Sequence, residues 1–122
     1  MVIRLDAVTV IINEPPYGSE KPWNALRLAS ALALDKFRCK VNIFLMGDAV
    51  SAAKRGQSTP EGYYNLGKML GMLLKRGVEI KVCGACINAR GLKEEGLVEG
   101  VERGSMMGLA EWVMQSQKII TF

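Results

Sequence analysis

Residues 8–12 read VTVII, an unbroken run of β-branched side chains. Such a run is typical of a strand that is buried on both faces of a parallel sheet. It ends in a loop, residues 13–19, that contains two prolines and a glycine. Residues 41–46 and 118–122 are similarly apolar. We therefore expect three strands of one sheet at these places.

Helix signals fill the segments between these runs. Apolar side chains recur at helical spacing from Pro22 to Leu34, which predicts a helix there. Asp48 is expected to cap a short helix that ends before Gly56, and Ser105 to cap the final helix. The inward side chains of that final helix are expected to be Met106, Leu109, Ala110 and Val113.

One more helix is predicted to begin at Thr59, which is followed by a proline and an acidic residue, and to stop at Gly77. Residues 78–82 then alternate apolar and charged side chains, as in a strand with one polar side. Residues 97–101 fit either a short strand or a connection. The apolar face of this helix is expected to hold Tyr63, Leu66, Leu70, Leu73 and Leu74.

This alternation predicts an α/β fold in three layers, with a mostly parallel sheet of about five strands and helices on both faces. We expect residues 1–122 to form one domain. In such sheets, sites lie beyond the carboxyl ends of the strands. Residues 13–19, 47–58 and 83–91 are expected to meet there. The candidate site residues in the first two segments are Asn13, Tyr17, Gly47, Asp48 and Ser58.

The amino-acid composition argues against several classes of site and partner. The 122 residues include no histidine, which excludes Ser-His and Cys-His catalysis and histidine-based zinc sites. The net charge is +4, but lysine and arginine form no run, so no nucleic-acid partner is expected. Residues 26–34 are too short to span a membrane, and residues 2–6 lack the features of a secretory signal. Three cysteines, an odd number, suit reduced thiols and a cytoplasmic location.

Cys83 is the strongest candidate for a reactive group. It follows the strand at residues 78–82 and precedes a segment that is expected to become helical around Gly84 to Ile87. The N–H groups and dipole at a helix start favour the thiolate, and Arg90 would add a positive charge. Gly84 leaves room for a close approach. The alternative is a small buried hydrophobic residue, which is how free cysteine usually behaves.

Cys86 completes a Cys-x-x-Cys motif with Cys83. Two thiols without histidine are too few ligands for zinc, so no metal site is expected. Thiol–disulfide exchange stays open, with Cys86 either resolving a bond to Cys83 or only packing. Cys39 is expected to be a loop or strand-edge residue.

At this point the sequence resembles the DsrE/DsrF-like family, with its YchN-like and TusD-like sulfur-relay proteins. The resemblance covers nearly the whole chain and rests on FLMGDAV at residues 44–50, VEIKVCGAC at residues 78–86 with Arg90-Gly91 after it, and the final Thr121-Phe122. It implies a three-layer α/β fold, a symmetric homo-oligomer (trimer or hexamer), no cofactor, and proteins that donate and accept sulfur. In active members the matching cysteine, here Cys83, carries a persulfide. Cys86 is not part of the sulfur-relay pattern.

The leading hypothesis is therefore a persulfide-carrying sulfur-relay protein or sulfurtransferase that uses the Cys83 thiolate, with residues 47–58 covering the site. Two alternatives stay open. One is a non-catalytic oligomeric subunit that binds a small anionic ligand at the strand-end loops. The other is a dithiol oxidoreductase with a reversible Cys83–Cys86 disulfide.

Overall fold

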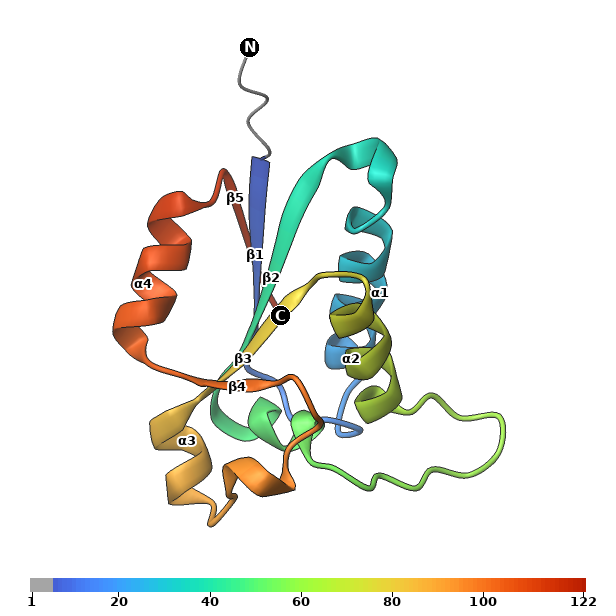
Figure 1. Cartoon of the computed structure of the whole chain (residues 1–122). Helices are drawn as coiled ribbons and strands as arrows, with labels where there is room; N and C mark the ends of the chain where they lie inside the picture. Colours follow the sequence, from blue (N-terminus) through green and yellow to red (C-terminus); the bar gives the residue numbers. More distant parts are fainter. Residues whose placement is uncertain (1–5) are drawn as a thin grey trace.

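The computed structural model describes residues 6–122 and contains a five-stranded, all-parallel sheet in the order β4-β3-β2-β1-β5 (Figure 1). Residues 1–5, most of the segment assessed above for a secretory signal, lie outside the described residues. The strands are β1 (Asp6–Ile12), β2 (Cys39–Leu45), β3 (Glu79–Cys83), β4 (Glu102–Gly104) and β5 (Lys118–Thr121). The most apolar strands, β1 and β2, are central, as buried parallel strands should be.

Helices cover both faces of the sheet, which confirms the predicted fold class (Figure 1). Helices α1 and α2 lie on one face, α4 lies on the other, and α3 continues directly from the end of β3. The α-helices are α1 (Lys21–Leu32), α2 (Leu66–Lys75), α3 (Gly84–Ala89) and α4 (Met106–Gln115). The 3-10 helices are η1 (Asp35–Phe37), η2 (Gly47–Ala53) and η3 (Glu94–Gly96).

The two faces of the sheet are built differently. Val10 on β1 and Ile43 on β2 pair in register and are fully buried on the side of α1 and α2. Phe44 points to the other side, where its ring meets the edge of Trp112 on α4 at 6.2 Å between centroids. Beside it, the buried hydroxyl of Thr9 is hydrogen-bonded to the Ser116 hydroxyl over 2.7 Å. Helix α4 is therefore held by both an apolar and a polar contact.

The start of α2 corrects the sequence prediction. The helix begins at Leu66 rather than near Thr59, because Asn65 is extended and its side chain accepts the Lys68 N–H over 3.0 Å. Gly62 before it has φ +86°, which no helix accommodates. Tyr63 is consequently 71% exposed and not part of the apolar face. The predicted burial of Leu66, Leu70 and Leu73 and the stop at Gly77 (φ +89°) are confirmed.

Two other local expectations also change. Ser105 caps α4 as predicted, but Trp112 is buried with Leu109, whereas Met106 and Ala110 are exposed. Asp48 caps nothing, because η2 starts without a side-chain cap. Residues 97–101 are a connection, and the missed strand β4 follows them.

Candidate functional site

Cys83 stands where β3 becomes α3. It is the last residue of the strand and the N-cap of the helix, and its Sγ accepts the Cys86 N–H over 3.3 Å. The extended backbone of Cys83 (φ −60°, ψ 118°) lets the strand run into the helix without a loop. The residue is only 9% exposed, so solvent has little access to it.

Burial raises the pKa of Cys83 above its ordinary value. A hydrogen bond with the Cys86 side chain acts in the same direction, while the backbone N–H groups of Cys86 and Ala85 lower the pKa. The sequence-based expectation of a helix start that favours the thiolate is therefore only partly right. The N–H groups are in place, but removal of water outweighs them, because a thiolate loses more from desolvation than a neutral thiol.

Cys86 lies one turn further along α3 and is more accessible than Cys83. Its Sγ accepts the backbone N–H of Gly47 over 3.2 Å, which ties α3 to the start of η2. Gly47 adopts φ +56°, a conformation that suits glycine, and the Asn13 carbonyl oxygen lies 3.9 Å from where its Cβ would be. Of the predicted site residues, Gly47 thus contacts Cys86, and Asn13 lies next to Gly47.

Arg90 and Asp48 form an exposed ion pair next to the contact between Cys86 and Gly47. The Arg90 Nε and Nη2 donate to one oxygen of Asp48, over 3.0 and 2.8 Å, and Nη1 donates to the Cys86 carbonyl over 3.1 Å. The guanidinium therefore joins η2 to the end of α3. None of these hydrogen bonds goes to the Cys83 sulfur, and Arg90 is not among the groups that shift the pKa of Cys83.

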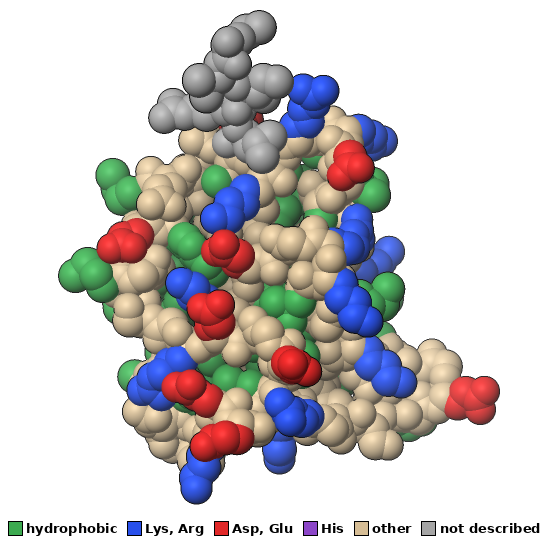
Figure 2. All heavy atoms as spheres, viewed as in Figure 1, with side chains coloured by type: hydrophobic (Ala, Val, Ile, Leu, Met, Phe, Trp, Pro, Cys, Tyr) green, Lys and Arg blue, Asp and Glu red, His purple; other side chains and the backbone are tan. Residues whose placement is uncertain are grey.

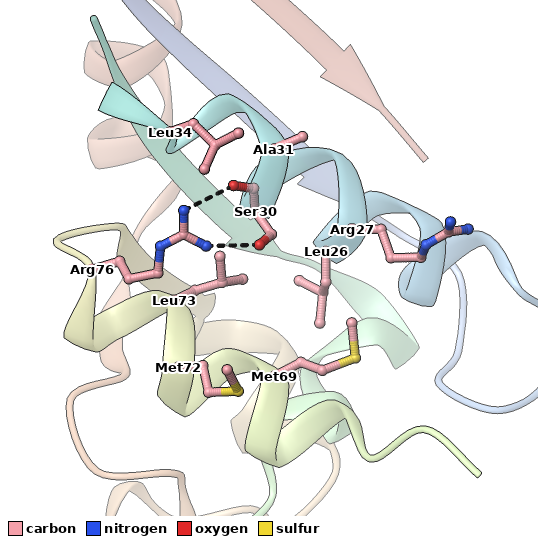
Figure 3. Close-up of a pocket in the computed structure, with 9 residues that line it drawn as sticks. All are labelled: Leu26, Arg27, Ser30, Ala31, Leu34, Met69, Met72, Leu73 and Arg76. Atoms are coloured by element: carbon pink, nitrogen blue, oxygen red, sulfur yellow. Dashed lines mark hydrogen bonds between the residues drawn. The ribbon is translucent and has the colours of Figure 1, made fainter. Parts of the chain in front are cut away.

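Two of the predicted site residues lie elsewhere. Tyr17 and Ser58 line a separate hollow that is formed with Tyr63 and Tyr64. The predicted site residues therefore divide between two places, with Gly47 and Asp48 against α3 near the thiols and Tyr17 and Ser58 at the hollow. A further groove lies between α1 and α2, with Met69, Met72 and Leu73 among its lining residues (Figure 3), and its volume is about 450 Å³. No thiol is among the residues that line it.

Sequence reasoning missed Arg103. Its guanidinium lies 2.8 to 3.0 Å from where a Cβ on Gly84 would stand, and it donates to Asn88 Oδ1 over 3.0 Å. The role of Gly84 is thus to admit the Arg103 side chain beside the start of α3. The strand that carries Arg103, β4, has only three residues and no apolar run, so no pattern in the sequence could have indicated the contact.

Other classes of site find no support in the described part of the chain. Among residues 6–122, no three histidine, cysteine, aspartate or glutamate residues are grouped so that they could hold a metal ion. Within the same range, no helix is long and apolar enough to cross a membrane. On the face shown in Figure 2, lysine and arginine are interspersed with aspartate and glutamate rather than gathered in a patch.

A profile of the DsrE/DsrF-like family matches residues 6–122, including the β3–α3 junction with Cys83. The chain belongs to the DsrE/DsrF-like family. It is 40% identical over 118 residues to Protein YchN of Escherichia coli (strain K12), which covers 97% of this chain and 100% of that protein. The crystal structure of YchN matches the fold with a TM-score of 0.91 over the same shares of both chains. A protein named Sulfurtransferase TusD homolog, from Vibrio vulnificus (strain YJ016), is 25% identical over 126 residues, covering 93% of this chain and 95% of that protein.

Proposed function

We propose that this protein carries sulfur as a persulfide on Cys83, as a relay protein or sulfurtransferase in the cytoplasm. The observation that carries the proposal is the Cys83 sulfur at a strand-to-helix junction, where it accepts the Cys86 N–H. Such donors stabilise sulfur anions. Membership of a family with a TusD homologue supports the same chemistry.

The transfer needs no external oxidant. The Cys83 thiolate attacks the outer sulfur of a donor persulfide, a new S–S bond forms, and the old S–S bond breaks. Its electron pair leaves with the donor thiolate. An acceptor thiolate then attacks the outer sulfur on Cys83 and releases the Cys83 thiolate by the same exchange. Donor and acceptor are expected to be proteins.

In this proposal, η2 covers the reactive Cys83 thiol at the junction of β3 and α3. Its hydrogen-bonded contacts with α3 are the part-buried bond from Gly47 to Cys86 and the more exposed ion pair of Asp48 with Arg90. Release of these contacts by a docking donor would increase access to Cys83. The closed arrangement limits the access of stray thiols to the labile sulfur between transfers.

Mass spectrometry after exposure to a persulfide donor tests the proposal. We expect an adduct of one sulfur atom on Cys83, which disappears when an acceptor thiol is added. The Cys86→Ser variant should still form it, and the Cys83→Ser variant should not. Wild-type protein with no adduct on Cys83 would overturn the proposal.

The burial of Cys83 and its raised pKa favour a second candidate, a non-catalytic subunit of a homo-oligomer that binds a small ligand. Unchanged cellular sulfur transfer in Cys83→Ser, with intact assembly, would favour this candidate. The Cys86 N–H to Cys83 Sγ contact also keeps a dithiol oxidoreductase open. Failure to form a Cys83–Cys86 disulfide under mild oxidation would remove that third function.

A further inference from the structure

The hollow that contains Tyr17 and Ser58 is a second site, separate from the thiols. It has a volume of about 600 Å³ and lies between the loop after β1 and the segment that leads into α2. It is lined by Tyr17, Glu20, Gln57, Ser58, Thr59, Pro60, Tyr63 and Tyr64. Three of these eight residues are tyrosines, and only one, Glu20, is charged at neutral pH. The lining is therefore aromatic with a single negative charge.

The aromatic wall is built by a stack of rings. Trp23 lies against Tyr64 at 4.9 Å between centroids and 14° between planes, and Tyr64 lies against Tyr17 at 5.7 Å and 18°. Arg27 covers Trp23, with 4.6 Å from its Cζ to the ring centroid. Tyr17 and Tyr63 are 44% and 71% exposed. They offer aromatic surface that nothing in residues 6–122 covers fully.

Tyr17, one ring of this aromatic wall, is held in place although its backbone conformation is unfavourable. Tyr17 has φ +65°, an unfavourable backbone conformation for a bulky side chain. Its hydroxyl donates to Gln57 Oε1 and accepts the Leu66 N–H over 3.0 Å. Gln57 in turn donates through Nε2 to the carbonyls of Ala52 and Lys54, over 2.7 and 2.9 Å. A strained residue fixed by so many contacts indicates a positioned side chain rather than a loose loop.

The negative charge of Glu20 at the hollow favours a positively charged ligand. Glu20 is exposed, and no ion pair or side-chain hydrogen bond engages its carboxylate within residues 6–122. The adjacent cations are already engaged, because Lys21 pairs with Glu14 over 3.6 Å and Arg27 donates to Asn24. Aromatic ring faces attract cations, and a carboxylate beside them adds to that attraction. We propose that this hollow binds an organic ammonium cation that is methylated on nitrogen.

Such a cation can be a free quaternary ammonium compound or a methylated lysine on a partner protein. Both share the methylated nitrogen that fits against ring faces. Two-dimensional NMR titrations with choline and with a trimethyllysine peptide distinguish a free ammonium compound from a methylated partner protein. The controls are 3,3-dimethylbutan-1-ol, which is the neutral isostere of choline, and the same peptide with unmodified lysine. We expect one cation to shift the amides of residues 17, 20, 57–59 and 61–64, and each control to bind more weakly.

Variants of exposed side chains test the site without disturbing the fold. Tyr63→Ala and Glu20→Gln should each weaken cation binding by about two- to fivefold, the size of one exposed cation–π contact. Tyr63→Phe keeps the ring and should bind as the wild type does. Phe37→Ala removes another half-exposed ring, outside the hollow, and should change nothing. Equal binding of the neutral isostere, or no shift of these amides with either cation, would overturn the proposal. The persulfide experiment on Cys83 is independent of either result.

Discussion

Cys83 combines a helix start that favours its thiolate with burial that opposes it. Because burial raises the pKa, the neutral thiol is the favoured form of Cys83 at neutral pH. Iodoacetamide should therefore alkylate Cys83 more slowly than Cys86 at pH 7, and the Cys83 rate should keep rising at pH values above the ordinary thiol pKa. Peptide mass spectrometry across a pH series measures both rates, with Cys83→Ser as the assignment control.

The same shift has a consequence for stability. The folded state holds the Cys83 proton more tightly than the unfolded chain does, so the unfolded chain ionises first as the pH rises. The stabilisation due to this thiol is complete below the ordinary thiol pKa and is lost as the pH rises toward the folded-state pKa. Fastest alkylation of Cys83 at pH 7 would contradict the assigned direction of the shift.

Gly104 is a residue whose missing side chain matters to the packing. A Cβ at this position would lie 2.8 Å from the ring of Phe44 and 3.2 Å from the Cβ of Lys81. Phe44 is fully buried and cannot move aside, so Gly104→Ala should lower the free energy of unfolding by about 1–3 kcal/mol. Urea unfolding measures the change.

Gly71 provides the matched control for this substitution. It lies inside α2, and nothing within 4 Å would meet a Cβ there. Gly71→Ala should raise the free energy of unfolding by about 0.5–1 kcal/mol, because alanine favours helix. Equal effects of the two substitutions would show that helix propensity and packing were assigned wrongly.

At the scale of elements, the four longer strands and most helices followed from the sequence because their burial leaves a pattern of apolar side chains. The VTVII run, the Ser105 cap and the stop at Gly77 are local signals, and each was placed correctly. The start of α2 was misplaced because Thr59-Pro60-Glu61 imitates a helix start. What decides against it is a pair of contacts from Asn65, one of which reaches back to the Gln57 carbonyl. The Asn65 cap on the Lys68 N–H is a local signal that sequence reasoning missed, whereas the contact with Gln57 and the position of Arg103 beside Gly84 arise only in the folded chain.

The true start of α2 can be measured by removing each candidate cap. Asn65 accepts the Lys68 N–H and donates to the Gln57 carbonyl, both over 3.0 Å. Asn65→Ala should therefore lower the free energy of unfolding by about 0.5–2 kcal/mol. Thr59→Ala, at a half-buried position with no helix cap to lose, should lower the free energy of unfolding less than Asn65→Ala does. Chemical denaturation compares the two variants, and a larger loss from Thr59→Ala would place the helix start where the sequence alone suggested it.

At the scale of the whole molecule, exposed methionines suggest where copies of the chain meet in the proposed trimer or hexamer. Met107 and Met114 are 72% and 85% exposed and, seven residues apart on α4, share one face. A single chain that presents such apolar residues gains by burying them in a subunit contact.

Replacement of these two methionines by lysine tests that surface. Met107→Lys with Met114→Lys should lower the molar mass measured by light scattering, while circular dichroism stays unchanged because neither side chain packs in the core. Met72→Lys is the matched control, since Met72 is 65% exposed on α2 in the groove of Figure 3. Dissociation by Met72→Lys alone would move the subunit contact from α4 to that groove. A wild-type protein with the mass of one chain would exclude both surfaces as subunit contacts, and Cys83 would then have to work within a single chain.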